Sequence, residues 1–188
     1  MEMVQHFRSM ARNNAWSNYR LHKACAGLTE AEFNQKRMSF FPSLPLTMLH
    51  ILEVDWLYLD QLEATPTDRD ATDYNLPYRT LAELTPAQQA MDLRLIAYCE
   101  RLTAQNVDAP VIIRRADGYR PVNPVAAVLT HLFVHQIHHR GQVHAMLAGT
   151  SVPPPQLDEF FLTEDQPLRA PDLAGVTYEG EQTLNGVH

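Results

Sequence analysis

Apolar residues recur at helical spacing in four long segments of the chain. Steps of three and four between apolar positions are typical of an amphipathic helix that packs one face on a core. The segments expected to be helical cover residues 2–26, 44–64, 86–106 and 124–149. Ser43 is a possible cap for the second, and Thr85 followed by Pro86 has the residue types that start the third. Asn123 and Pro124 start the fourth in the same way.

Two shorter elements are expected between these helices. The β-branched residues around Asp117-Gly118 predict a small β-ribbon with a two-residue hairpin turn. Thr29 and Glu32 have the spacing of a capping box, which indicates one additional short helix.

After residue 149 the chain contains three consecutive prolines, which cannot continue a helix. The pattern as a whole predicts an all-α fold: a four-helix bundle with a β-hairpin before the last helix and an irregular C-terminal tail. We expect one bundle domain over residues 1–165 and an acidic, loosely ordered tail over residues 166–188.

Composition fits a globular chain and excludes two classes of partner. The 188 residues are 45% hydrophobic and 20% charged, with a net charge of −7. Residues 149–188 contain one basic residue and seven acidic ones, so the body of the chain is nearly neutral. Without a basic face, neither nucleic-acid binding nor polybasic attachment to a membrane is expected.

The two cysteines, Cys25 and Cys99, are too few for a secreted disulfide framework, and they lie within expected helices. They are interpreted as small, reduced core residues. No segment is long and apolar enough to span a membrane, and the N-terminal sequence has no signal-peptide pattern. A cytoplasmic location is therefore expected.

Histidine is the unusual feature of the composition, with nine residues of which five lie between positions 131 and 144. In the last helix, a buried seam in steps of three and four would be formed by Val125, Val128, Leu132, His135, His139, Gln142 and Met146. The middle of this seam is polar, and buried polar groups need partners. Two histidines at i and i+4 lie on one helical face, where they can share a metal ion.

Other histidines compete for this role. His131 and His135 have the same spacing as His135 and His139, so spacing alone leaves both pairs open; the seam favours the second. A third ligand should come from another helix, and His50 is the only histidine in the second one. His6 and His22 in the first helix are less favourable because they lie near its two ends.

Well-known catalytic motifs are absent from the chain. No HExxH motif occurs, and no histidine has a glutamate three residues before it, which excludes the zincin and di-iron carboxylate patterns. Phosphate-binding and nucleophile-elbow motifs are also missing.

Three features of the sequence together resemble a known family. They are the opening ARNNAWSNYRL, the histidine of the second helix followed by Asp55 and Trp56, and above all the motif HxxxHRGQ over residues 135–142. On these features the chain is similar to the DinB/YfiT-like metalloenzymes over about residues 1–165. The resemblance implies a four-helix bundle with His50, His135 and His139 as metal ligands, and a homodimer.

Three histidine ligands leave a position open on the cation, as in catalytic sites. The family includes enzymes that use low-molecular-weight thiols, so the resemblance implies a divalent metal, zinc or nickel, and a thiol-dependent S-transferase acting on small electrophiles. Glu53 is a candidate for orienting a ligand or moving a proton, and Arg140 and Gln142 are interpreted as supporting residues. The alternatives are a metal-dependent hydrolase, a non-catalytic metal-binding stress-response protein, or a bundle without metal.

Overall fold

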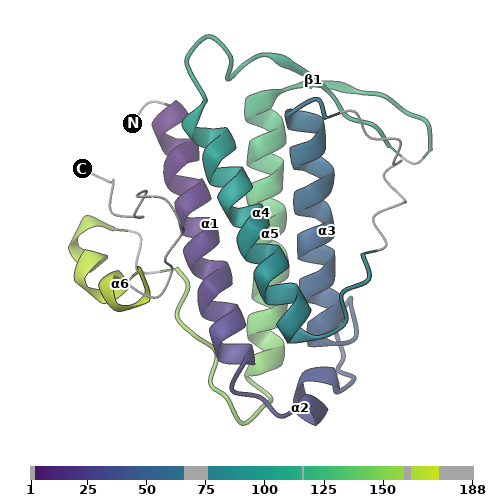
Figure 1. Ribbon diagram of the computed structural model, residues 1–188, viewed down its shortest axis with the longest axis vertical. Coiled ribbons are helices and arrows are strands. Elements are labelled where there is room, and N and C mark those ends of the chain that lie inside the picture. The colour runs from purple at the N-terminus through teal and green to yellow at the C-terminus, as the bar shows by residue number, and fades with distance from the viewer. Residues whose placement is uncertain (1–2, 66–75, 116, 159–161, 174–188) are drawn as a thin grey trace.

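The computed structural model describes residues 3–65, 76–115, 117–158 and 162–173. Four long helices form a bundle: α1 (Met3–Cys25), α3 (Leu44–Leu62), α4 (Leu81–Glu100) and α5 (Val125–Leu147). Helices α1 and α3 each pack against both α4 and α5, and Figure 1 shows the four helices side by side. The predicted all-α bundle is confirmed.

Short elements close the two ends and one side of this bundle. The helix α2 (Glu30–Asn34) follows α1, and the predicted capping box of Thr29 and Glu32 is present. The strands β1 (Pro110–Ile112) and β2 (Val122–Pro124) form the predicted antiparallel hairpin before α5. Figure 1 shows the hairpin lying across the end of the bundle opposite α2.

Helix α4 begins earlier than predicted. Its N-cap is Thr80, not Thr85, because the Thr80 side chain and Glu83 form a reciprocal capping box. Two backbone donors are satisfied in this way before Pro86 is reached. Pro86 lies inside the helix, and the Thr85 hydroxyl instead lies 2.9 Å from Nδ1 of His22 on α1.

Helix α4 also ends earlier, at Glu100 instead of Asn106. The Asn106 side chain accepts a hydrogen bond from the backbone N–H of Thr103 at 2.7 Å and donates one to the carbonyl of Arg101 at 3.2 Å. Asparagine side chains favour turns by bonding to nearby backbone groups. Residues 101–106, which were expected to be helical, are therefore turns and irregular chain.

The hairpin turn is longer than the predicted two residues. Pro110 faces Pro124 in the ladder, and the same register brings the N–H of Arg115 to the carbonyl of Tyr119 at 3.1 Å. A turn of Asp117 and Gly118 alone would shift this pairing by one position. Gly118 does supply a positive φ of 81°, which glycine adopts without steric cost.

The segment beyond residue 165 was expected to be loosely ordered, yet Gln166–Leu173 form helix α6 after the 3-10 turn η1 (Thr163–Asp165). The carboxylate of Asp172 is buried and pairs with Arg20 at 2.5 Å and Lys23 at 3.3 Å, both on α1. These ion pairs hold α6 beside α1. Residues 174–188 lie outside the described residues, and the domain boundary stays a prediction.

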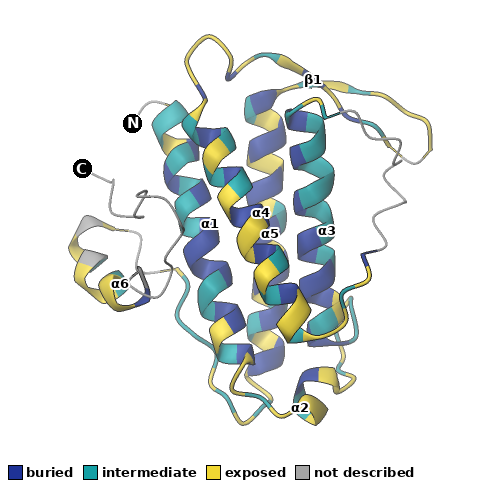
Figure 2. Ribbon diagram, viewed as in Figure 1, coloured by how far each residue is buried: buried dark blue, intermediate teal, exposed yellow. Residues whose placement is uncertain are grey.

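The core lies between the four long helices, as Figure 2 shows by the inward position of the buried residues. Leu44, Leu59, Leu129 and Leu147 are completely buried. Cys25 and Cys99 are free and buried, as predicted. Burial raises the pKa of both thiols to about 12, so neither is a reactive thiolate.

Candidate metal centre

Three histidines from two helices converge between α3 and α5. The ligand atoms that His50, His135 and His139 can offer all lie within 4.8 Å of one another. His135 and His139 are one turn apart on α5, and their ring centroids are 4.3 Å apart. His50 faces them from α3, with its ring centroid 4.6 Å from that of His139. The structure thus brings together the three histidines that the sequence singled out.

The His139 ring is oriented by a neighbour on its own helix. Its Nδ1 lies 2.8 Å from Oε1 of Gln142, and Nε2 of the same amide lies 3.2 Å from Nε2 of His138. An amide oxygen only accepts, so the His139 proton is on Nδ1 and the lone pair of Nε2 is free for a ligand. Such a bond fixes the tautomer and direction of a metal-binding imidazole.

The distances between the nitrogens fit one shared cation. Nε2 of His50 and Nε2 of His135 are 3.0 Å apart. Two nitrogens that each lie about 2.1 Å from one ion at an angle of about 90–110° are separated by about 3.0–3.4 Å. The buried Nδ1 of His135 has no hydrogen-bond partner within the described part of the chain.

The cluster consists of neutral imidazoles. Burial, together with the neighbouring imidazoles, lowers the pKa of His50 to about 4 and that of His135 to about 3. Burial also lowers the pKa of His139. Neutral imidazole is the form that binds metal, so no proton must be displaced near neutral pH.

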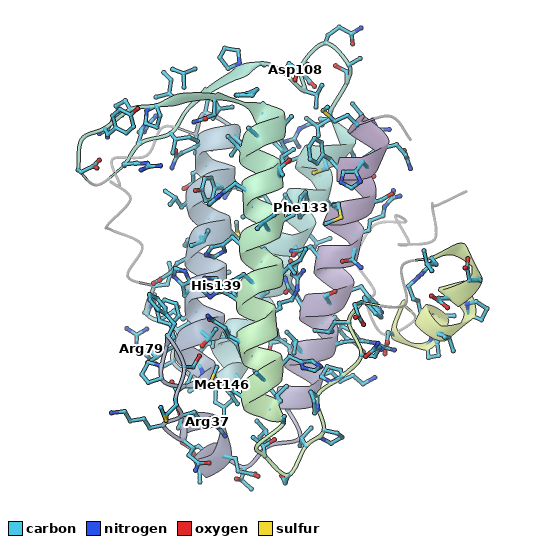
Figure 3. All side chains as sticks on the ribbon, turned by 180° about the vertical axis from the view of Figure 1, so that it is seen from behind. Arg37, Arg79, Asp108, Phe133, His139 and Met146 are labelled. Atoms are coloured by element: carbon cyan, nitrogen blue, oxygen red, sulfur yellow. The ribbon has the colours of Figure 1, made fainter. Side chains whose placement is uncertain are left out.

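An aromatic side chain packs against the histidines from the loop before α3. The ring centroid of Phe41 is 4.4 Å from that of His50 and 5.8 Å from that of His139. Figure 3 shows His139 on the edge of α5 that faces α3, with Arg79 and Arg37 on the same side of the molecule. Phe41 therefore provides an apolar wall beside the nitrogens.

The remaining histidines of α5 lie off the cluster, as expected from the helical spacing. His131 is exposed and its ring packs near Tyr58, with centroids 5.3 Å apart. His138 is exposed, and His144 faces away from α3 into a different cavity.

Glu53 lies one helical turn after His50 on α3. Its Oε1 accepts a hydrogen bond from the backbone N–H of Leu76 at 3.2 Å, which ties the carboxylate to the segment before α4. Burial raises the pKa of Glu53, while the Leu76 bond and the charge of Arg79 lower it. Its catalytic role stays a prediction.

The most buried side of α5 is rotated from the seam predicted in the sequence. Leu129, Leu132, Gln136 and Val143 are completely buried, and Arg140 is only 4% exposed. Because α5 packs against both α1 and α3, it buries a wider arc than a single stripe. His135 and His139 lie at the edge of this buried side, next to α3. Gln136 and Arg140 lie at its centre and are its polar residues.

Polar side chains from all four long helices meet at this centre. Asp55 on α3 accepts hydrogen bonds from Gln136 on α5 and from Gln88 on α4, the latter at 2.8 Å. Asp92 on α4 accepts from Asn18 on α1 at 2.8 Å. These residues form a buried polar layer that links the helices beside the histidine cluster.

Arg140 completes the buried polar layer. Its Nη1 donates to the side-chain oxygens of Asn14 and of Asn18, the latter at 3.2 Å. Both asparagines also donate to Oδ1 of Asp92. The asparagines thus connect a buried cation to a buried carboxyl.

Only indirect signals in the amino-acid pattern point to this layer. Gln136 and Arg140 continue a second helical series through Leu129, Leu132, Val143 and Leu147. That series has the same spacing as the predicted seam, so spacing alone does not choose between them. Asp55 and Asp92 also interrupt apolar series at helical spacing: Met48, Leu52, Leu59 and Leu62 flank Asp55, and Leu84, Leu95 and Cys99 flank Asp92.

Asp92 should make stability depend on pH in a defined direction. Burial and the charge of Asp55 raise the pKa of Asp92 from 3.8 to about 8. The folded protein keeps this proton over a range in which the unfolded chain has lost it, so the free energy of unfolding falls as pH rises through that range. Asp92→Asn removes this contribution. The difference in melting temperature, Asp92→Asn minus wild type, should be larger at about pH 8.5 than at about pH 5 by about 5 °C.

Thermal unfolding in the presence of a chelator measures this difference. Glu83→Gln is the control, because hydrogen bonds from Arg79 and Thr80 lower the pKa of the Glu83 carboxyl. The difference in melting temperature between Glu83→Gln and wild type should therefore stay constant from about pH 5 to pH 8.5. A difference for Asp92→Asn that does not change with pH would show that Asp92 is ionised throughout.

Comparisons with known proteins agree with the fold. The DinB family model matches residues 3–172. A DinB-like protein from Bacillus cereus ATCC 10987 has a similar structure, with a TM-score of 0.55, 19% identity, and coverage of 75% of this chain and 91% of that one. A DinB-like protein from Bacillus subtilis, YjoA, gives a TM-score of 0.52 and 20% identity over 81% of this chain and 96% of that one. No curated protein matches.

None of the helices in the described part of the chain has the length and apolar character of a membrane span.

Proposed function

Because the chain belongs to the DinB family, we propose that it is a metal-dependent enzyme whose divalent cation is held by His50, His135 and His139. The observation that carries this proposal is the convergence of three neutral imidazoles from α3 and α5 within 4.8 Å. Imidazole is a good ligand for zinc and nickel, which are the proposed metals.

The proposed reaction is transfer of a low-molecular-weight thiol to a small electrophile. Three protein ligands leave a position for a further group, as in catalytic sites. When bound, the cation would lower the pKa of a thiol held at that position, so that the thiolate forms near neutral pH.

The surrounding residues have distinct roles in this proposal. Gln142 keeps the His139 proton on Nδ1 and so directs Nε2 toward the other two rings. Phe41 covers one side of His50 and excludes water there. Glu53, which is partly buried and one turn from His50, is proposed to orient the bound thiol or to accept its proton.

A thiol-transfer assay tests the proposal. Protein loaded with zinc or nickel is mixed with bacillithiol, mycothiol or glutathione, with monobromobimane as the electrophile. We expect a metal-dependent increase in rate that is lost in His135→Ala and retained in His131→Ala, whose side chain is exposed.

Two results would contradict the proposal. One is full turnover by His135→Ala protein that contains no metal. The other is metal binding that raises the melting temperature without accelerating thiol transfer or ester hydrolysis, which would favour the non-catalytic role, with the cation connecting α3 to α5. A homodimer, a cytoplasmic location and a stress-response role rest on the family resemblance and the sequence, and stay predictions.

A further inference from the structure

A cavity lies between α1, α5 and the chain segment of residues 156–158. Its volume is about 490 Å³, within the range of sites that enclose small molecules. Figure 1 shows the chain after α5 running back along α1 to reach this position. Ile137, Gly141 and His144 form the α5 wall.

The cavity is separate from the candidate metal centre. Gly141 is two residues from His139, which corresponds to about 200° of rotation around an α-helix. The histidine cluster faces α3, whereas residues of α1 such as Asn13 and Ser17 line the cavity. Helix α5 therefore has a candidate site in each of its two grooves.

A buried and oriented cation lines the cavity. Arg140 is only 4% exposed, and Nη1 of its guanidinium is held by the side chains of Asn14 and Asn18. A guanidinium carries five N–H donors, three of which are on Nη2 and Nε. Because Arg140 is also part of the cavity lining, these donors can bind a planar carboxylate in the fork geometry that arginine favours.

An acidic residue lies at the rim of the same cavity. Asp158 is exposed and its Oδ1 accepts a hydrogen bond from Nε2 of Gln156 at 2.6 Å. The backbone carbonyl of Gln156 accepts one from Arg20 on α1 at 3.0 Å. The segment that carries the acid is thus fixed to α1, so the cavity offers a cation inside and an anion at its rim.

The space between these charges is partly apolar and is kept open by a glycine. Met10, Ile137 and Leu157 line it. Gly141 lies inside α5, where a glycine makes the helix less stable than an alanine would, by about 1 kcal/mol. A Cβ added to Gly141 would meet nothing within 4 Å, so packing against neighbours does not require the glycine.

We propose that this cavity is a second ligand site that binds a small zwitterion with an apolar side chain, such as an amino acid or a short peptide. The ligand carboxylate binds Arg140, its ammonium group lies near Asp158, and its side chain contacts Met10, Ile137 and Leu157. This assignment does not depend on the proposed metal chemistry.

Titration followed by ¹H–¹⁵N NMR tests the proposal on the full chain. The probes are L-leucine, 4-methylpentanoate, which lacks the ammonium group, and 3-methylbutylamine, which lacks the carboxylate. Chelator-treated protein is used, so that binding of an amino acid to metal does not contribute. We expect leucine to shift the signals of residues that line the cavity, with at least about tenfold weaker binding of the other two probes.

A variant that fills the cavity provides the decisive comparison. Gly141→Leu places a side chain in the cavity, and should fold because a Cβ at this position meets nothing within 4 Å and leucine favours helix. It should weaken leucine binding at least about tenfold. Ala127→Leu, at an exposed position of the same helix outside the cavity, should bind like wild type.

Three outcomes would overturn the proposal. The first is that leucine up to about 20 mM shifts no NMR signal of the cavity residues. Any affinity would then be weaker than that of a specific small-molecule site. The second is equal binding of leucine and 4-methylpentanoate, which removes the role of Asp158. The third is unchanged leucine binding by folded Gly141→Leu.

Discussion

Replacing His139 by alanine is expected to reduce the metal content of the purified protein from about one equivalent to less than about a tenth of that. The loss follows because only two imidazoles would remain, His50 on α3 and His135 on α5. His50→Ala and His135→Ala should have the same effect. The measurement is elemental mass spectrometry of protein purified without a histidine tag, followed by titration with zinc and nickel.

His138→Ala is the matched control for this experiment. His138 is adjacent to His139 in sequence, but its side chain is exposed and contacts Gln142. We expect metal content near that of wild type, with affinity reduced by less than about tenfold. Equal metal content in His139→Ala and wild type would exclude the proposed ligand set. A wild-type protein that takes up neither metal would exclude the metal centre.

Replacing Arg140 by methionine is expected to lower the free energy of unfolding by about 3–5 kcal/mol. The guanidinium is buried and donates to Asn14 and Asn18, so its removal leaves two buried side-chain oxygens without this donor. It also removes the positive charge that lowers the pKa of Asp55 and Asp92. Urea unfolding of chelator-treated protein, monitored by circular dichroism, measures the change.

Arg101→Met is the control for the loss of an arginine. The Arg101 side chain is 61% exposed and pairs with Glu63 at 2.9 Å. Exposed ion pairs contribute about 0–1 kcal/mol, so this variant should unfold close to wild type. A decrease of less than about 1 kcal/mol for Arg140→Met would show that the buried polar layer can be lost without cost.

His139 and Arg140 are consecutive in the sequence but belong to different parts of the protein. One helical residue corresponds to a rotation of about 100°, which separates their side chains. His139 points into the groove with α3, and Arg140 reaches α1 through Asn14 and Asn18. The motif HxxxHRGQ therefore combines the candidate metal site with the contact that joins α5 to α1.

Local features were predicted well where neighbouring residues determine them. The capping box of Thr29 and Glu32 joins groups only three residues apart, and it is present in the structure. The same device at Thr80 and Glu83 explains why α4 begins before Pro86. In that region the sequence contained two possible starts, and the one that satisfies more backbone donors is used.

The sequence by itself determined that four long helices and a hairpin form and that histidines lie at i and i+4 on the last helix, because hydrophobic period and spacing along one helix are local properties. The bounds of α4 and the helix α6 did not follow from it. The sequence also singled out His50, since the second helix contains no other histidine. Only the tertiary structure decided how α5 is rotated between α1 and α3, because that rotation depends on packing against two neighbours at once. The rotation places the histidines at the edge of the core, Gln136 and Arg140 at its centre, and Gly141 beside the second cavity.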